Sequence, residues 1–270
     1  MLDCITPVLL TGNEAPNIGG TLSRLSWARD IVVVDSGSTD GTLATLARWR
    51  NVRVFSRPFD THAGQWRYAV TDTAIATPWI LRLDADYRLT DAFVEELSRL
   101  DPRAAVSAYT VSFDYAVFSH KLRASLYPPN TILLRRGRFD VRDDGHTEIW
   151  TVEGPVRPLQ ARIIHDDWKS ITAWLNSQGR YMSRELAELS TGRRGFKERL
   201  RLAPPLMPFA VFLYCLFGKG LILAGRRGLF YALQRLVAEA VLSLMVLENT
   251  LRAGSPRETP SPRDVSVKPE

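Results

Sequence analysis

Three short polar segments of this chain could bind and activate a charged ligand: Thr11-Gly12-Asn13-Glu14, Asp35-Ser36-Gly37-Ser38 and Asp84-Ala85-Asp86. In the last segment two aspartates are two residues apart, so extended backbone would aim both carboxylates the same way. Neighbouring carboxylates repel each other unless a cation lies between them, and Mg²⁺ or Mn²⁺ prefers such oxygen ligands. The triplet therefore predicts a divalent-metal site open to phosphate oxygens, although most isolated Asp-x-Asp pairs are solvated loops.

Each polar segment follows a run of residues expected to form a β-strand. Apolar runs occupy residues 7–10, 31–34 and 79–83, and residues 31–34 are all β-branched, which is typical of a strand buried on both faces. Helical patterns lie between these runs. The alternation predicts an α/β fold with a mostly parallel sheet. Ligands of such sheets bind beyond the carboxyl ends of the strands, where the three polar segments fall.

Alternative interpretations of these segments remain open at this stage. Asp35 could be a turn residue that caps the next helix, although Asp40 is better placed for that role. The chain contains no G-x-G-x-x-G run and no G-x-x-x-x-G-K-S/T run, which argues against dinucleotide-binding and P-loop proteins.

Four segments, in their order and spacing, resemble the nucleotide-binding half of family 2 glycosyltransferases with the GT-A (Rossmann-like) fold. They are Asn13-Glu14, residues 33–42, residues 64–69 and residues 83–86. The resemblance covers about residues 3 to 100 and is greatest to the branch that builds lipopolysaccharide core and related envelope polysaccharides. It implies a nucleoside-diphosphate sugar donor, inversion at the anomeric carbon and a requirement for Mg²⁺ or Mn²⁺.

The resemblance also implies roles for individual residues. Thr11, Glu14 and Asp35 would contact the nucleoside, Gln65 and Arg67 would line the donor pocket, and Asp86 would bind the metal. The complete set expected to bind the nucleotide-sugar is Thr11, Asn13, Glu14, Asp35, Ser36, Gln65, Arg67, Asp84, Ala85 and Asp86.

One position departs from the family pattern. Many relatives carry an acid directly after the Asp-x-Asp triplet, where this chain has Tyr87, and a tyrosine is not anionic at neutral pH. A third metal ligand must therefore come from elsewhere. His165 follows a strand-like segment, and in GT-A enzymes a histidine near the end of the catalytic domain often binds the metal. Alternatively, His165 is a strand-end residue without that role.

The acceptor half contains a dense polar cluster at residues 143–148. Relatives carry an acid in this region, and an inverting transfer needs a carboxylate to take the proton of the acceptor hydroxyl. Glu148 is the first candidate for this base and Asp144 the second. His146 could orient the base. The alternative is a polar hairpin loop that uses Asp144-Gly145 as its turn.

The C-terminal part combines apolar and basic residues. Residues 193–235 contain nine Lys or Arg and one acid, Glu198, and residues 206–223 and 229–251 are strongly apolar. Within 229–251, polar residues recur at near-helical spacing: Gln234, Arg235, Glu239, Ser243 and Glu248. This pattern favours an amphipathic helix on an anionic membrane surface over a spanning helix, and it argues against nucleic acid as a partner. The alternative is a helical pair packed on the catalytic domain or on a second subunit.

These observations predict a catalytic domain at residues 1–192, a membrane-associating segment at 193–252 and a disordered Pro/Ser-rich tail at 253–270. The start of the sequence lacks a signal-peptide pattern and only two cysteines occur, so the cytoplasmic face of the cell membrane is expected. The predicted activity is an inverting, metal-assisted glycosyltransferase acting on a lipid-linked or cell-envelope glycan. The alternatives are a polyprenyl-phosphate sugar synthase and a non-catalytic nucleotide-sugar-binding protein. The oligomeric state stays open.

Overall fold

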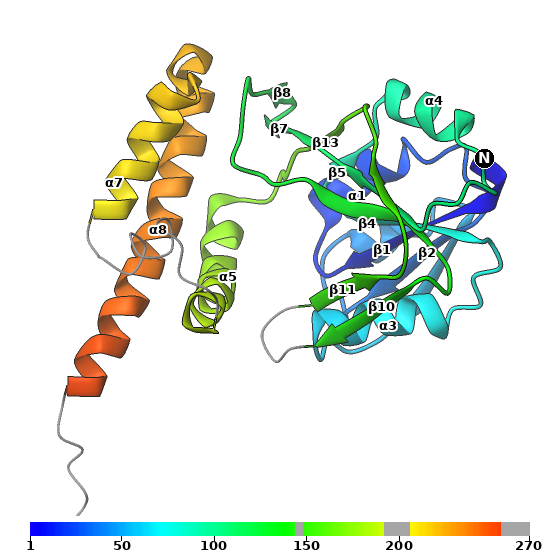
Figure 1. The fold of residues 1–270 in the computed structure, drawn as a ribbon, viewed down its shortest axis with the longest axis horizontal. Helices are drawn as coiled ribbons and strands as arrows, with labels where there is room; N and C mark the ends of the chain where they lie inside the picture. Colours follow the sequence, from blue (N-terminus) through cyan, green and yellow to red (C-terminus); the bar gives the residue numbers. More distant parts are fainter. Residues whose placement is uncertain (144–147, 192–205, 255–270) are drawn as a thin grey trace, which may run out of the picture.

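A computed structural model describes residues 1–143, 148–191 and 206–254 (Figure 1). After a short 3₁₀ helix (η1, Leu2–Cys4), the chain enters a seven-stranded sheet. In spatial order its strands are β12 (Val156–Pro158), β6 (Ala108–Val111), β9 (Asn130–Arg135), β4 (Trp79–Asp84), β1 (Ile5–Thr11), β2 (Ile31–Asp35) and β3 (Val52–Ser56). Parallel pairing joins β4, β1, β2 and β3, whereas β9 is antiparallel to both β4 and β6. The predicted α/β fold with a mostly parallel sheet is confirmed.

Helices cover both faces of this sheet. They are α1 (Ala15–Leu22), α2 (Thr42–Leu46), α3 (His62–Thr71) and α4 (Asp91–Arg99). Apolar residues of α1, α2 and α4 share one core with Val33, while residues of α3 share the other core with Val32 and Val34. Successive residues of β2 thus enter opposite cores, which explains why residues 31–34 contain no polar side chain.

The sequence pattern predicts helices over residues 42–49 and 65–75 and a third helix capped by Thr90. The observed ends of the first two differ from the predicted ranges. The helix expected over residues 42–49 ends at Leu46, and the helix expected over 65–75 is α3, which begins at His62 because Thr61 accepts a hydrogen bond from Gly64 N. The predicted cap of α4 is present, since the Thr90 side chain accepts a hydrogen bond from Phe93 N at 3.1 Å. Helix type and approximate position follow from periodicity, whereas the ends depend on individual capping contacts.

Two smaller sheets complete the catalytic part. One contains, in spatial order, β5 (Tyr87–Arg88), β13 (Ile163–His165), β7 (Phe113–Val117) and β8 (His120–Lys121). The other is a hairpin of β10 (Phe139–Asp143) and β11 (Glu148–Val152), which packs on α3. In the first of these sheets His165 pairs with Tyr87, so a segment from late in the chain lies directly beside the acidic triplet.

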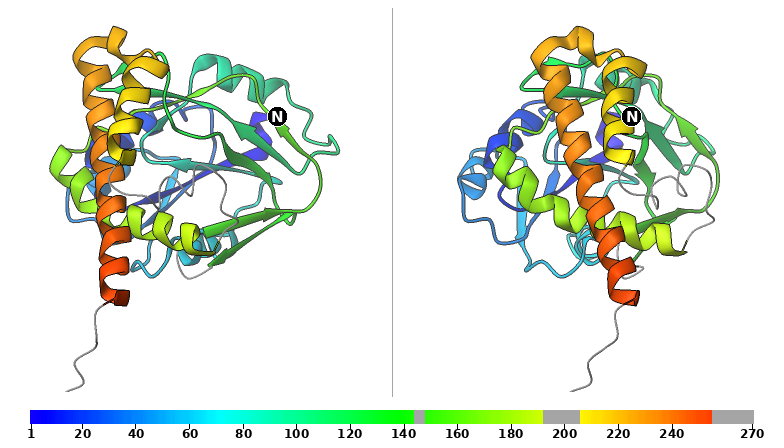
Figure 2. Two further views of the ribbon diagram at one scale, coloured as in Figure 1. Left: turned by 60° about the vertical axis from the view of Figure 1, so that its left-hand side comes forward. Right: turned by 90° about the vertical axis from the view of Figure 1, so that its left-hand side faces the viewer.

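Three long helical segments lie on one side of the α/β domain (Figure 2). They are α5 (Ile171–Thr191), α7 (Leu206–Leu213) and α8 (Gly225–Gly254); a π-helical turn (η2, Tyr214–Gly218) and a 3₁₀ turn (η3, Leu221–Ala224) connect the last two. We call α7, η2, η3 and α8 together the C-terminal hairpin. It packs on the catalytic part through Tyr231, whose hydroxyl accepts a hydrogen bond from Leu126 N at 2.8 Å. The middle of α8 packs on α5 through Ala238 and Leu242.

The polar residues of α8 do not share one solvent-facing stripe, in contrast to the expected amphipathic arrangement: Glu248 is exposed, and Gln234 and Arg235 are partly exposed. Glu239 and Ser243 are 3% and 8% exposed, whereas Leu244 and Leu251 are 66% and 62% exposed. Ala238 and Leu242, each next to one of these two buried residues in the sequence, pack against α5. The contact with the catalytic domain that the alternative interpretation expected is present. The basic cluster before residue 206 and the tail after 254 lie outside the described residues.

Candidate active site

The polar ends of β1, β2 and β4 lie level with one another at one edge of the sheet. The register pairs Thr11 with Asp35, and Leu10 with Asp84. Thr11 and Asp35 are buried, and the Thr11 hydroxyl donates to an Asp35 oxygen at 2.9 Å. The parallel sheet therefore gathers three segments that are far apart in the sequence, as expected for strand ends in this fold class.

Asp35 is held by its own turn. One carboxylate oxygen accepts hydrogen bonds from Gly37 N and Ser38 N at 3.0 and 2.8 Å, and the other accepts from the hydroxyls of Thr11 and Ser38. The interpretation of Asp35 as a turn residue describes this geometry well. Asp40, which was better placed to cap the next helix, accepts a hydrogen bond from Thr42 N at 2.9 Å, but the N-cap position of α2 is Gly41.

Asn13 joins the loops that follow β1 and β2. Its φ of 59° lies in the left-handed region, which asparagine tolerates better than most residues. Its backbone N–H donates to Ser38 Oγ and its side-chain oxygen accepts from Thr39 N, both at 2.8 Å. Ser36 adds a backbone bond to Thr11 O at 2.9 Å. These hydrogen bonds join the loop after β1 to the loop after β2 at the strand ends.

Asp86 and His165 are brought together although 79 residues separate them. His165 Nε2 lies 3.1 Å from Asp86 Oδ2, and each side chain is about one-seventh exposed, at 13% and 14%. The turn between β4 and β5, which carries Asp86, is held by two hydrogen bonds. Ala85 O accepts one from the Thr21 hydroxyl at 2.6 Å, and Asp86 O accepts one from Asp166 N at 3.1 Å.

The charges at this point are unevenly distributed. Asp84 lies at the exposed end of β4, but its desolvation by the surrounding protein raises its pKa, and the neighbouring charge of Asp86 raises it further. Burial alone would also raise the pKa of Asp86, but His165 outweighs this effect and leaves the pKa below its usual value. For His165, burial opposes protonation, while Asp86 raises the pKa above the ordinary value. Each side chain of the pair thus favours the charged form of the other.

The side chains of Asp86 and His165 are of the kinds that bind a divalent cation, but they would fill only part of its coordination shell. Asp86 Oδ1 and His165 Nδ1 are buried, and neither finds a hydrogen-bond partner among the described residues. The same residues contain no group of three His, Cys, Asp or Glu side chains that could enclose an ion. Asp86 and His165 could therefore supply two ligands, with phosphate oxygens and water completing the shell.

Tyr87 is not available as a ligand, because it is 1% exposed and packs within an aromatic cluster. Its hydroxyl lies 2.6 Å from that of Tyr127, and the Tyr127 ring lies 4.4 Å from the His165 ring. The centroid of the Tyr115 ring lies 4.9 Å from that of His165 and 4.8 Å from that of Tyr231 in α8. The imidazole is thus clamped by tyrosines, one of which rests on the C-terminal hairpin.

Glu14 has two partners that the sequence did not suggest. Lys169 Nζ lies 2.7 Å from Glu14 Oε1, and the amide of Asn17 donates to Glu14 Oε2 at 3.0 Å. Burial raises the pKa of Glu14 to about 7, against the lowering effect of Lys169. The only indication in the sequence that Lys169 lies near the site is its position four residues after His165. Asn17 lies inside a helix and carried none.

Gln65 and Arg67 both contact backbone near the site. The Gln65 amide donates to Arg57 O and Pro58 O at 3.1 and 3.0 Å, which holds the loop after β3. Arg67 Nη2 donates to Val141 O at 2.8 Å, which ties α3 to the β10–β11 hairpin. The two side chains therefore hold the loop after β3 and the β10–β11 hairpin in place; their predicted position in a donor pocket stays a prediction.

Glu148 begins β11 and approaches the strand that carries the triplet. Its Oε1 lies 3.9 Å from Arg82 Nη1, and Arg82 also lowers the pKa of Asp84. The Arg82 guanidinium lies over the rings of Trp150 and Trp66, at 4.7 and 5.6 Å. The sequence indicated this contact only through Arg82 itself, the one charged residue within the otherwise apolar run 79–83.

Asp144, the second candidate base, and the neighbouring His146 lie outside the described residues. The flanking strands form a hairpin in which Asp143 pairs with Glu148. The strands on either side of this segment are paired, and Glu148 lies near Arg82; the predicted turn at Asp144-Gly145 lies outside the described residues.

A mostly parallel sheet with this set of polar strand ends defines a glycosyltransferase of the GT-A fold. The chain belongs to glycosyl transferase family 2, whose model matches residues 8–152.

Individual relatives cover different parts of the chain. It is 28% identical over 238 residues to the lipopolysaccharide core biosynthesis glycosyltransferase LpsC of Rhizobium meliloti, a match that covers 82% of this chain and 83% of that protein. It is 31% identical over 97 residues to an uncharacterized glycosyltransferase of Rickettsia felis, with 36% and 33% of the two chains covered.

Solved structures give weaker likenesses. S. aureus TarS 1–349 in complex with UDP-GlcNAc has 12% identity and a TM-score of 0.47, with 92% of each chain covered. Glucosyl-3-phosphoglycerate synthase from Mycobacterium tuberculosis in complex with Mn²⁺ and UDP-glucose has 22% identity and a TM-score of 0.33, with 42% and 43% covered.

Proposed function

We propose that this glycosyltransferase moves a sugar, with inversion, from a nucleoside-diphosphate sugar to a hydroxyl of a lipid-linked or cell-envelope glycan. The observation that carries the proposal is the level arrangement of Thr11, Asp35 and the Asp86–His165 pair at one edge of the sheet. Membership of family 2 supports it, and so does the 28% identity to a protein named for lipopolysaccharide core biosynthesis.

In the proposed arrangement the nucleoside lies over Thr11, Glu14 and Asp35, and the diphosphate lies near Asp84 and Asp86. Asp86 and His165 would hold Mg²⁺ or Mn²⁺. When bound, the cation neutralises charge on the diphosphate and thus favours its departure. The unpaired oxygen of Asp86 supports this assignment, because a buried carboxylate oxygen without a partner is costly.

Inversion requires the acceptor hydroxyl to attack the anomeric carbon from the side opposite the diphosphate. The new carbon–oxygen bond forms as the bond to the diphosphate breaks, and the diphosphate leaves with the electron pair. Glu148 would take the hydroxyl proton. Its proximity to Arg82, which interacts with Asp84, supports a position near the donor.

A thermal-shift screen tests the donor class. With Mn²⁺ present, one of the UDP-, GDP- or ADP-sugars is expected to raise the melting temperature by about 5 °C or more at saturating concentration. The increase should disappear when EDTA removes the metal. CMP-sugars, which carry a single phosphate, serve as the comparison outside the class. If none of the diphosphate sugars shifts the transition, the proposed function is wrong.

We further propose that the C-terminal hairpin lies on the cytoplasmic face of the membrane with its exposed apolar side in the lipid interface. The exposed residues at its tip include Phe217 and Leu223, at 64% and 72%. Between residues 206 and 247 the sequence has one acid, Glu239, which is buried, and four cations: Lys219, Arg226, Arg227 and Arg235. This composition suits anionic headgroups. Residues Leu221–Ala253 are long and apolar enough to cross a bilayer by length and composition alone.

Replacing Phe217 and Leu223 together with serine should lower binding to anionic lipid vesicles at least about tenfold, because each side chain would otherwise bury apolar surface in the interface. Co-sedimentation with phosphatidylcholine vesicles containing phosphatidylglycerol measures the effect. Phe59→Ser, at a 52% exposed position of the catalytic part, is the matched control. Unchanged sedimentation of the double variant would refute a lipid-facing tip, and resistance of the wild-type protein to alkaline extraction would indicate a spanning helix instead.

A further inference from the structure

The segment Asp166–Lys169, which we call the strap, connects the end of β13 to α5 and crosses the edge of the proposed donor site. Asn17 of α1 fastens it from below: its amide donates to Asp167 Oδ1 and its oxygen accepts from Trp168 N, both at 2.8 Å. Asn17 is 4% exposed. The strap is therefore fixed to the first helix of the sheet, directly after the residue His165.

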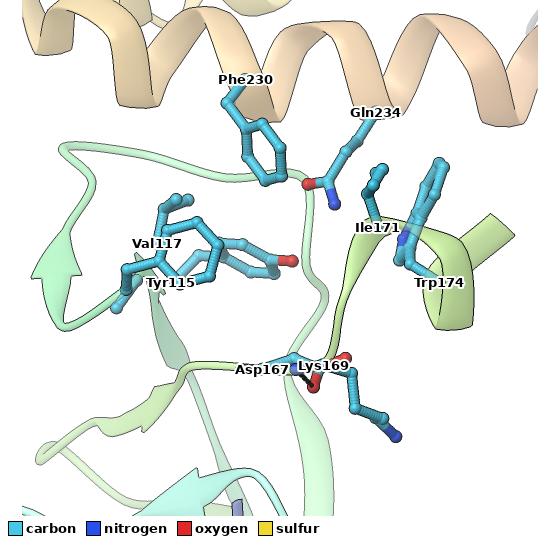
Figure 3. A pocket seen from close by; sticks show the side chains of 10 residues that line it. Tyr115, Val117, Asp167, Lys169, Ile171, Trp174, Phe230 and Gln234 are labelled. Atoms are coloured by element: carbon cyan, nitrogen blue, oxygen red, sulfur yellow. Dashed lines mark hydrogen bonds between the residues drawn. The ribbon is translucent and has the colours of Figure 1, made fainter. Parts of the chain in front are cut away.

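On its other side the strap borders a small pocket of about 20 Å³ between β7, α5 and α8 (Figure 3). Gln234 of α8 and Tyr115 of β7 point into this pocket, while the side chain of Lys169 runs away from it. The ammonium group instead reaches Glu14, 155 residues away in the sequence. Lys169 is thus directed toward the loop after β1 and not toward the hairpin.

Lys169 combines a buried carboxylate partner with partial access to solvent. Its side chain is 28% exposed, whereas that of Glu14 is 15% exposed. Its charge also acts on Asp86, where it contributes, after His165, to the lowering of the pKa. One ammonium thus contacts Glu14, expected at the nucleoside, and acts electrostatically on Asp86, expected at the metal.

The other nearby cations are already engaged within the protein. Arg82 lies beside Glu148, Arg88 pairs with the buried Asp166, and Arg67 donates to the backbone of β10. A lysine is a flexible point charge that can exchange one anionic partner for another, whereas Arg82 is held between two rings and Arg88 by Asp166 and Ser119.

We propose that Lys169 leaves Glu14 when the donor binds and pairs with the donor's diphosphate. This inference rests on the proposed function and adds a residue to its site. The diphosphate gains one negative charge when its bond to the sugar breaks, and a cation already in position stabilises that charge without reorganisation. Glu14, which has the Asn17 amide as a second partner, holds Lys169 in place while the site is empty.

The test compares Lys169→Gln with Lys169→Arg. Glutamine keeps a hydrogen-bond donor for Glu14 but no charge, whereas arginine keeps the charge. Isothermal titration calorimetry in MnCl₂ would measure binding of UDP, GDP and ADP and of the parent nucleosides. For the diphosphate that the wild type binds, Lys169→Gln is expected to weaken affinity about 10- to 100-fold and Lys169→Arg less than about fivefold, with nucleoside affinity unchanged in both. Lys121→Gln, at an exposed lysine of β8, is the charge-matched control.

Diphosphate affinity within twofold of wild type in Lys169→Gln would overturn the inference. A parallel loss of nucleoside affinity would also overturn it, because it would indicate that Lys169 only supports the loop around Glu14. If the wild-type protein binds none of the three diphosphates, the proposed function itself fails, which is a separate and recognisable result.

Discussion

Replacing Asp86 with alanine is expected to abolish Mn²⁺-dependent binding of the donor and to lower turnover about 1,000-fold or more, equivalent to about 4 kcal/mol of transition-state stabilisation. The physical reason is that Asp86 would be the anionic ligand of the metal, and its partner His165 cannot replace a carboxylate. The change also leaves His165 without the charge that raises its pKa. Calorimetric titration with the identified nucleoside diphosphate, with and without Mn²⁺, measures the binding effect.

Asp91→Asn is the matched control for this change. Asp91 is an aspartate whose side chain is 95% exposed and pairs only with Arg24 at the surface. Its replacement should leave donor binding unchanged, because exposed ion pairs contribute little. If Asp86→Ala bound the diphosphate with unchanged affinity in the presence of Mn²⁺, the metal assignment would be wrong and the triplet would have a structural role.

Replacing Glu148 with glutamine is expected to lower turnover about 100- to 10,000-fold while donor affinity stays within about twofold, since a general base acts on the acceptor and not on the donor. Glutamine keeps the size of the side chain and its oxygen near Arg82. Steady-state kinetics together with donor binding separate the two effects. Glu153→Gln, at an exposed position directly after the same strand, is the control.

The outcome for Glu148 also distinguishes the candidate reactions. A phosphate acceptor is already an anion and needs no base, so full turnover in Glu148→Gln would favour a polyprenyl-phosphate sugar synthase or move the base to Asp144. Absence of any product with the wild-type protein, despite tight donor binding, would favour a non-catalytic nucleotide-sugar-binding protein.

The strands and the polar segments that end them were predictable from the sequence because they depend on local patterns. Burial on both faces requires apolar residues at consecutive positions, as in β2, and this pattern does not depend on distant parts of the chain. The sheet then placed Thr11, Asp35 and Asp84 at one edge, because parallel strands end on the same side. The family resemblance added the donor class, which no periodicity contains.

Only the tertiary structure decided which side chains meet at this edge. The pairing of Lys169 with Glu14 joins residues 155 apart, and the bond from Leu126 N to the Tyr231 hydroxyl joins residues 105 apart. Such contacts depend on how β13 and α8 pack, and a sequence pattern carries no information about that packing. The polar residues of α8 show the same limit. Their helical spacing predicted one polar face, whereas in the structure Glu239 and Ser243 are buried and Glu248 is exposed, because the exposure of each position depends on which elements pack beside it.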